Sequence, residues 1–217
     1  MDTAEKRNEI SDKEYIDLVQ PYKDALRNIA ARLDTLALDY KYTFQSEPVH
    51  HMQKRVKSKE SIQDKLVRKK LEVTYLNAKE NLLDIAGIRV ICYFIRDIYQ
   101  IAGLLKKQKD LEIIKETDYI KTPKVNGYRS YHIVFGVPIY HVMGMEYFPV
   151  EVQLRTMTMD LWASMEHRVC YKKEAKLCEE RNEAFLKYAM QLKALEEELE
   201  QNAREKWLAE SCALVDK

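Results

Sequence analysis

The chain has 217 residues, a length that provides one domain with a proper hydrophobic core rather than two large domains. Its 36 lysines and arginines nearly balance 35 aspartates and glutamates, which excludes the global basic field that holds long nucleic acids, so we expect a local anion site and no DNA partner. The polar N-terminus, the lack of an apolar run long enough to span a bilayer and four cysteines without C-x-x-C spacing predict a cytoplasmic protein with reduced thiols, neither secreted nor embedded in a membrane.

The first forty residues are predicted to be helical. Ser11 and Glu14 have the spacing of a capping box, so the helix should begin there, and Pro21 should restart or kink it. Apolar residues then recur at helical spacing and form one stripe that can pack against a sheet. They are Tyr22, Leu26, Ile29, Leu33 and Leu36. We interpret this part of the chain as scaffold.

A basic, strand-like stretch follows and leads into a short helix. The period-two geometry of a strand places Arg55 and Lys57 on the same face. Ser58 has the position of an N-cap for the helix that comes next. Ser61 and Lys65 share a side of this helix near its start, where free backbone N–H groups and the helix dipole favour phosphate.

The middle of the chain has the rhythm of strand, helix and strand. Further strands are predicted at residues 87–94, 111–114, 130–140 and 147–155. Residues 96–107, between the first two of these, carry apolar residues at helical spacing. A short segment around Gly144 should join the last two strands as a hairpin. The predicted fold class is therefore α/β or α+β, with a mixed sheet of about five strands flanked by N- and C-terminal helices.

A turn and an aromatic residue precede the first strand of this hairpin. Asn126 and Gly127 form a turn that can bring the following residues close to a ligand. There Tyr128 can stack on a base, while Arg129 and His132 address phosphate oxygens or a ribose. This combination of residues indicates a nucleotide site.

The second strand of the hairpin alternates between apolar and polar residues. Val150, Val152 and Leu154 should face the core. Glu151, Gln153 and Arg155 should face the other way, where they are free for chemistry.

The rest of the chain is predicted to be helical, first at residues 158–172 and then in a charged stretch at residues 179–207. The charged helix is too polar to be buried in a core, yet its apolar residues need a partner surface. These residues are Phe185, Leu192, Leu195 and Leu199. Two interpretations stay open: the helix folds back on its own domain, or it joins copies of the chain.

Five motifs in order resemble the synthetase domain of the RelA/SpoT family, specifically its small, synthetase-only alarmone synthetases. They are Arg55-Val56-Lys57-Ser58-Lys59-Glu60-Ser61 with Lys65, Asp84-Ile85-Ala86-Gly87-Ile88-Arg89, Asn126-Gly127-Tyr128-Arg129-Ser130-Tyr131-His132, Glu151-Val152-Gln153-Leu154-Arg155-Thr156 and Trp162-Ala163-Ser164-Met165-Glu166-His167. The resemblance implies a nucleotidyltransferase-like synthetase domain over residues 1–176 and a C-terminal helical extension, 177–217, for oligomerisation. The long relatives carry a hydrolase domain with a His-Asp motif, which this sequence lacks, so synthesis without hydrolysis is implied.

The resemblance implies a GTP diphosphokinase of the stringent response, which moves the β,γ-pyrophosphate of ATP to the 3′-hydroxyl of GDP or GTP and gives ppGpp or pppGpp plus AMP. By the same resemblance Asp84 and Glu151 bind Mg²⁺, and Glu151 takes the proton from the 3′-hydroxyl. The implied ATP-binding residues are Arg55, Lys57, Ser61, Lys65 and Arg89, the two arginines sandwiching adenine. The implied GDP/GTP-binding residues are Tyr128, which stacks on guanine, and Lys121, Lys124, Arg129, His132 and Gln153.

The resemblance also implies a homo-oligomer, commonly a tetramer, in which some members bind product alarmone allosterically. A nucleotidyltransferase of the polymerase-β kind is disfavoured, because the chain lacks a Gly-Ser turn followed by an Asp-x-Asp pair. A catalytically inactive module that binds guanine nucleotides or single-stranded RNA is a further alternative. Intact Asp84 and Glu151 argue against an inactive relative, and the near-zero net charge argues against RNA as the sole ligand.

Overall fold

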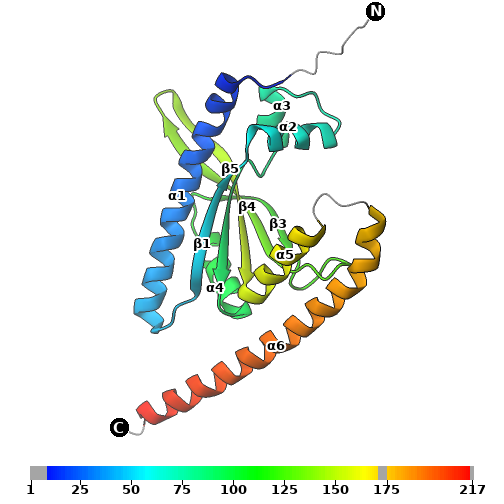
Figure 1. Cartoon of the computed structure of the whole chain (residues 1–217). Helices are drawn as coiled ribbons and strands as arrows, with labels where there is room; N and C mark the ends of the chain where they lie inside the picture. The colour runs from blue at the N-terminus through cyan, green and yellow to red at the C-terminus, as the bar shows by residue number, and fades with distance from the viewer. Residues whose placement is uncertain (1–8, 171–174, 216–217) are drawn as a thin grey trace, which may run out of the picture.

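The computed structural model describes the backbone of residues 9–170 and 175–215 and the side chains of residues 9–169 and 182–203. Five strands form one sheet in the order β1-β2-β5-β4-β3 (Figure 1). They are β1 (Val49–Val56), β2 (Ala86–Cys92), β3 (Glu112–Asp118), β4 (Tyr131–His141) and β5 (Gly144–Thr156). β2 and β5 are parallel, whereas the other neighbours are antiparallel, so the predicted mixed sheet of five strands is confirmed.

One long helix, α1 (Asp12–Phe44), covers one face of the sheet together with α4 (Ile95–Lys106). The predicted capping box is present, since the Ser11 hydroxyl accepts from the Glu14 N–H and the Glu14 carboxylate accepts from the Ser11 N–H. The expectation that Pro21 restarts the helix is wrong, because α1 runs through Pro21 as one element. Pro21 is the tenth residue of α1 and removes one interior backbone hydrogen bond, and burial of Leu18 and Tyr22 in the core on either side of it holds the helix together there.

The core lies between α1 and the sheet. Val150, Val152 and Leu154 of β5 are fully buried there, as their alternation predicts. The apolar stripe of α1 packs against them, and burying one such aliphatic side chain contributes about 2 kcal/mol. The opposite face of the sheet therefore carries the alternate, polar side chains of the same strands.

Two short helices, α2 (Lys59–Arg68) and α3 (Tyr75–Asn81), follow β1 and precede β2 along the chain. The predicted N-cap of α2 is confirmed: Ser58 Oγ accepts from the Ser61 N–H at 3.3 Å. The sequence interpretation did not include α3, which is only seven residues long and too short to show a helical period. Its N-cap is Thr74, whose hydroxyl accepts from the Asn77 N–H.

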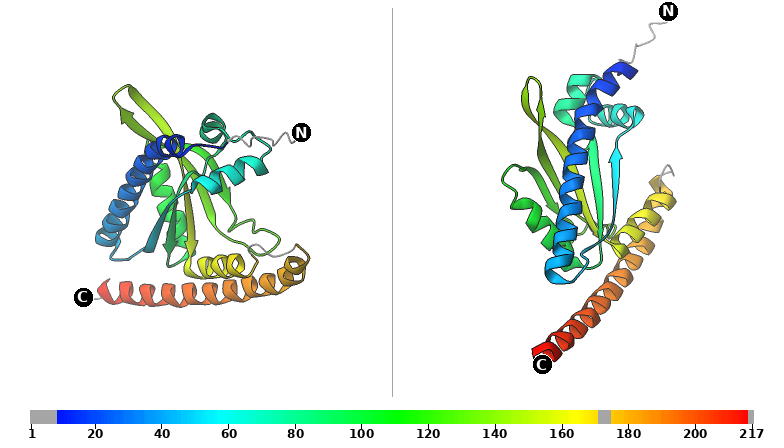
Figure 2. Two further views of the ribbon diagram at one scale, coloured as in Figure 1. Left: turned by 45° about the horizontal axis from the view of Figure 1, so that its top comes forward. Right: turned by 90° about the vertical axis from the view of Figure 1, so that its left-hand side faces the viewer.

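Helix α5 (Met157–Cys170) follows β5 directly, and the long α6 (Ala175–Val215) runs past it along the lower edge of the domain (Figure 2). α6 buries Phe185, Ala189 and Glu196 and leaves Leu195 and Leu199 about half exposed. It therefore folds back on its own domain and still presents apolar side chains outward. Among the described residues, no helix combines the length and the apolar character needed to cross a membrane.

Candidate active site

Two cavities adjoin on the face of the sheet that carries the polar side chains of β5. The larger, of about 540 Å³, is lined by residues of β1, β2 and β5, and the smaller, of about 300 Å³, by residues of α2, β3, β4 and β5. Asp84 and Glu151 line both cavities. The site therefore has two compartments that meet at two carboxylates.

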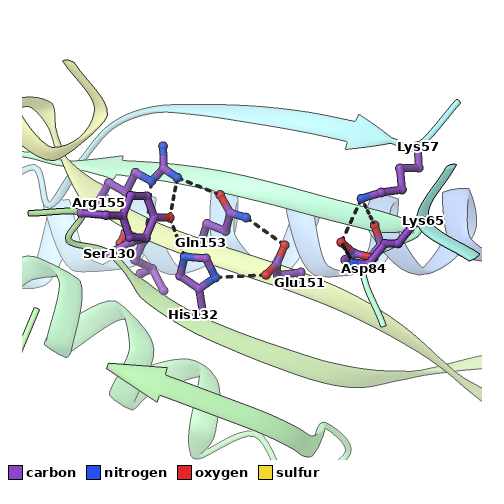
Figure 3. Close-up of polar contacts among 10 residues, drawn as sticks. Lys57, Lys65, Asp84, Ser130, His132, Glu151, Gln153 and Arg155 are labelled. Atoms are coloured by element: carbon purple, nitrogen blue, oxygen red, sulfur yellow. Dashed lines mark hydrogen bonds and ion pairs between the residues drawn. The ribbon is translucent and has the colours of Figure 1, made fainter. Parts of the chain in front are cut away.

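Asp84 is held by two lysines. The Lys57 N–H donates to the Ile85 carbonyl at 2.8 Å, so the pairing of β1 with β2 continues far enough to place Lys57 beside Asp84. Lys57 Nζ lies 2.9 Å and Lys65 Nζ 2.5 Å from Asp84 Oδ2 (Figure 3). Burial disfavours the charged form, but the hydrogen bonds from Lys65 and Lys57 outweigh it, so the pKa of Asp84 lies below its ordinary value. The carboxylate is ionised at neutral pH.

Glu151 is held by an imidazole and an amide. On β4, which is antiparallel to β5, His132 Nδ1 lies 3.0 Å from Glu151 Oε1. On β5 itself Gln153 Nε2 donates to Glu151 Oε2 at 2.8 Å (Figure 3). Burial raises the pKa of Glu151, and the hydrogen bonds from His132 and Gln153 more than reverse this, leaving it below its ordinary value.

Arg155 connects both partners of Glu151. Its Nη2 donates to Tyr128 Oη at 2.7 Å and to Gln153 Oε1 at 3.3 Å. Tyr128 Oη lies in turn 2.9 Å from His132 Nε2. All contacts are satisfied when Tyr128 donates to Nε2 and His132 donates its Nδ1 hydrogen to Glu151. Two hydrogen-bonded arms thus run from Arg155 to the two oxygens of Glu151.

This role of Arg155 was missed at the sequence level, although the alternation of β5 places it on the polar face. Its side chain is only 6% exposed, and its Nη1 also lies 3.1 Å from Asp160 Oδ1. Arg89 Nη1 reaches the same Asp160 oxygen at 3.2 Å. The buried guanidinium is therefore compensated by a carboxylate and fixed on several sides.

Tyr128 is half-buried and surrounded by other rings and cations. It makes edge-to-face contacts with Tyr119 and Trp162, at centroid distances of 5.8 and 6.2 Å. Lys124 Nζ lies 5.0 Å from the centre of its ring, and the Arg155 guanidinium 5.2 Å from it. Lys124 is exposed, so a stacked base can take its place over the ring at little cost.

The structure brings most of the expected site residues together. Arg55, Lys57, Arg89 and Gln153 line the larger cavity, and Lys65 and His132 line the smaller one. Ser61 lies at the start of α2, where its hydroxyl accepts from Ser58 Oγ at 3.1 Å. Lys121 projects into solvent, 3.6 Å from Asp118, and lines neither cavity.

Arg129 does not join the residues that surround the two cavities. Its guanidinium turns away from both cavities and lies buried against α6, 2.9 Å from Glu196 Oε2. The expectation that Arg129 addresses a nucleotide phosphate therefore finds no support in its position.

The smaller cavity also contains residues that the sequence interpretation left out. Lys115 and Thr117 line it from β3, and Lys69 lines it from the end of α2. The strand was predicted to end at residue 114, whereas β3 extends to Asp118, so the alternation of Lys115 and Thr117 was not considered. A longer strand prediction would have placed both on one face.

The two carboxylates fit a hard divalent cation such as Mg²⁺. Asp84 Oδ1 is buried and has no hydrogen-bond partner in the described part of the chain, while Oδ2 takes both lysines. Within that same part, no three His, Cys, Asp or Glu side chains gather into a metal cluster. Mg²⁺ is commonly bound by one or two carboxylates plus substrate phosphates, so two carboxylates between two cavities suit it.

Comparison with known proteins agrees with this geometry. Residues 54–176 match the model of a region found in RelA/SpoT proteins. The chain belongs to the RelA/SpoT family. It is 45% identical over 151 residues to the GTP pyrophosphokinase YwaC of Bacillus subtilis, an alignment that covers 70% of this chain and 72% of that relative.

Solved structures of family members have the same fold. The crystal structure of small alarmone synthetase 1 from Bacillus subtilis bound to its product pppGpp superposes with a TM-score of 0.79 at 30% identity, over 90% of this chain and 99% of that one. The same synthetase bound to AMPCPP gives a TM-score of 0.72 at 27% identity, over 89% of this chain and 100% of the other. The α+β fold expected from the motifs is thereby confirmed.

Proposed function

We propose that this chain is a GTP pyrophosphokinase of the stringent response, which transfers the β,γ-pyrophosphate of ATP to the 3′-hydroxyl of GDP or GTP and releases AMP. The observation that carries this proposal is the meeting of two cavities at Asp84 and Glu151. Such a transfer needs two nucleotides whose reacting ends meet at one set of carboxylates. The names of the relatives support the same activity. An inactive module is less well supported, since it has no need of this carboxylate pair.

ATP is assigned to the larger cavity. Arg55 and Arg89 line it from the neighbouring strands β1 and β2, and their flat guanidinium groups can lie on either side of adenine. Lys57 and Lys65 stand at Asp84, where they can exchange this carboxylate for phosphate oxygens. Ser61, at the N-terminus of α2, adds a hydroxyl beside free backbone N–H groups.

GDP or GTP is assigned to the smaller cavity. Tyr128 lies next to this cavity, where it contacts the lining residues Tyr119 and His132, and supplies a ring for guanine. Gln153 lines the larger cavity and reaches the reacting end of the nucleotide at Glu151, which both cavities share. Lys121 and Lys124 are exposed loop cations that can approach the 5′-phosphates. Arg129 has no part in this assignment, because Glu196 holds it on the far side of the loop.

Glu151 takes the proton from the 3′-hydroxyl in this mechanism. The ribose oxygen forms a bond to the β-phosphorus of ATP, the bond from that phosphorus to the α,β-bridging oxygen breaks, and AMP leaves with the electron pair. His132 and Gln153 fix both oxygens of Glu151 and so aim the base at the hydroxyl. Lys57 and Lys65 hold positive charge beside the transferred group.

Asp84 and Glu151 are the residues that would hold Mg²⁺. The ion, when bound, supplies positive charge across the phosphates and so lowers the repulsion between them and the attacking oxygen. Mg²⁺ dependence is accordingly part of the proposal, as is the absence of hydrolase activity, because the sequence has no His-Asp dipeptide. The cytoplasm is the proposed location.

The proposal is tested by incubating the purified protein with ATP, Mg²⁺ and either GDP or GTP and resolving the nucleotides by anion-exchange chromatography. We expect AMP in equal amount to a new, more highly phosphorylated guanine nucleotide, and no AMP when Mg²⁺ is removed by a chelator. Tight binding of guanine nucleotide without AMP would instead favour the inactive module. Single-stranded RNA or alarmone added to the same assay tests for regulation by either.

A homo-oligomer, expected to be a tetramer, completes the proposal. An apolar cavity of about 650 Å³ lies between α5 and α6 and is open to solvent. Its rim carries Leu161, Met165 and Leu195, each about half exposed, which a second copy of the chain would cover. We expect Leu195→Lys to lower the mass measured by light scattering, with Glu198→Lys, at an exposed position on the same helix, as the control. An unchanged mass for Leu195→Lys would contradict this.

A further inference from the structure

A buried ion pair joins the C-terminal helix to the loop that carries Tyr128. Arg129 in this loop is 6% exposed and Glu196 on α6 is 3% exposed, and Arg129 Nη1 lies 2.9 Å from Glu196 Oε2. Thr158 Oγ1 donates to the other Glu196 oxygen at 2.7 Å. Burying two charges costs desolvation free energy that their attraction only partly offsets, so such a pair is poorly explained by stability alone. It does fix the position of one element on another.

The backbone of the same loop lies directly on α6. Gly127 has a φ of 88°, and a Cβ built on it would lie 2.5 Å from the Ala189 Cβ. The Gly127 N–H donates to the Lys124 carbonyl at 2.8 Å, and the Lys124 N–H donates to the Tyr128 carbonyl at 3.1 Å. Glycine at position 127 thus serves close packing on the helix, where the sequence interpretation expected close approach to a ligand.

Tyr128 itself connects α6 to the catalytic base. On one side its ring contacts Trp162, which contacts Phe185 of α6 at a centroid distance of 5.9 Å and donates its Nε1 hydrogen to the Phe185 carbonyl at 2.8 Å. On the other side its hydroxyl reaches His132, which reaches Glu151. The ring assigned to guanine is therefore set between the C-terminal helix and the reaction centre.

We propose that α6 is a positioning element for the acceptor nucleotide, and that Arg129 and Glu196 are positioning residues that hold the acceptor loop, residues 124–129, on this helix. The inference rests on the proposed function for the identity of the acceptor. It assigns to Arg129, the one expected nucleotide ligand that is buried away from both cavities, a role in placing Tyr128. It also predicts that disturbing α6 weakens binding of guanine nucleotide and leaves binding of ATP unaffected, because the pair holds the loop of Tyr128 and none of the described residues 124–129 lines the larger cavity.

The test uses the full-length chain with Glu196→Gln, which keeps the shape of the side chain and removes its charge. Glu197→Gln is the matched control, since Glu197 is the next residue on α6 and its side chain is 59% exposed, paired only at the surface with Lys193. Affinities for GDP alone and for ATP alone are measured by calorimetry, together with the KM for each nucleotide and the thermal unfolding midpoint. We expect the Kd and KM for GDP to rise roughly tenfold, a usual size for coupling between separate elements, with ATP binding and the control unchanged.

An unchanged Kd for GDP in Glu196→Gln would overturn the inference, and so would equal losses for GDP and ATP, which indicate general loosening. If Glu196→Gln does not fold, the double variant Arg129→Met with Glu196→Met removes both buried charges and undergoes the same measurements. There a normal Kd for GDP again refutes positioning by the ion pair. Binding of GDP is measured without turnover, so a wild-type chain that produces no AMP would sink the proposed function and leave this test intact.

Discussion

The two carboxylates at the centre of the site are held by opposite means. Asp84 is held directly by two cations, Lys57 and Lys65, within 3 Å. Glu151 is held by an imidazole and an amide, and the Arg155 guanidinium is separated from it by one residue, Gln153, along one arm and by two, Tyr128 and His132, along the other. Direct cations make a carboxylate a permanent negative charge, which suits holding a metal. Donors other than lysine or arginine orient a carboxylate and still let it accept a proton, which suits a base.

Asp97 shows what burial does without such compensation. It is 2% exposed at the start of α4, where its Oδ2 accepts from the Phe94 N–H at 3.1 Å. Its Oδ1 is 3.6 Å from Arg96 Nε, outside hydrogen-bond distance. Burial raises the pKa of Asp97 to about 6, the reverse of the direction at Asp84 and Glu151. Burial raises the pKa of all three groups, and the number and directness of the donors decide whether this rise is reversed.

The largest effect is expected from a substitution of the base, Glu151. Glu151→Gln keeps the volume and the contacts to the cavity walls but cannot take a proton, so turnover should fall by roughly 10²- to 10⁴-fold. Binding of GDP should change little. AMP formation and GDP affinity check this together, and near-normal AMP formation would refute the assignment of Glu151.

The next largest effect is expected from a substitution of Arg155, which supports Glu151 and not Asp84. Arg155→Lys keeps the charge opposite Asp160 but cannot donate to Tyr128 and Gln153 at once. Loss of orientation at Glu151 should lower kcat by roughly 10- to 100-fold with the KM for ATP unchanged. Lys57 and Lys65, which hold Asp84, do not depend on Arg155. A matching rise in the KM for ATP would therefore show that the groups holding Asp84 and those holding Glu151 are not independent.

A smaller effect is expected at Tyr128, where ring and hydroxyl have different roles. Tyr128→Phe keeps the ring for guanine and cuts one arm to Glu151, so kcat should fall about 3- to 10-fold, the value of one hydrogen bond, with GDP affinity nearly unchanged. Tyr128→Ala removes the ring as well and should weaken GDP binding. Comparing the KM for GDP in both variants checks this. Equal GDP affinity in the two would contradict a stacking role.

Local patterns predicted those features that depend on neighbouring residues. The two N-caps, Ser11 and Ser58, and the alternation that places Glu151 opposite Val150 and Val152 follow from geometry within one element. The strand predicted at residues 87–94 begins just after Asp84, as β2 does. The approach of Lys57 to Asp84 was not predicted, because it depends on the antiparallel pairing of β1 with β2 and not on neighbouring residues.

Features that depend on distant segments could not be predicted in this way. The sequence predicts a strand ending at residue 114, but pairing with β4 extends β3 to Asp118 and so places Lys115 in the smaller cavity. Arg129 directly follows Tyr128, and its role differs because a carboxylate 67 residues further along the chain, Glu196, reaches it. No periodicity within one element records which helix a loop will contact.

The smallest expected effect concerns Asp97 and stability against pH. Because its folded pKa of about 6 lies above that of an unfolded Asp, near 3.9, the folded state binds the proton more tightly between these values. The contribution of Asp97 to stability is therefore present below about pH 4 and is lost as the pH rises to about 6. The side chain introduced by Asp97→Asn does not titrate. The free energy of unfolding of this variant minus that of wild type should therefore increase from pH 4 to pH 7. Urea denaturation of both proteins at several pH values measures this difference. A difference independent of pH would mean that the Phe94 N–H and Arg96 compensate Asp97 as fully as the lysines compensate Asp84, and burial would then have no visible cost at any of the three carboxylates.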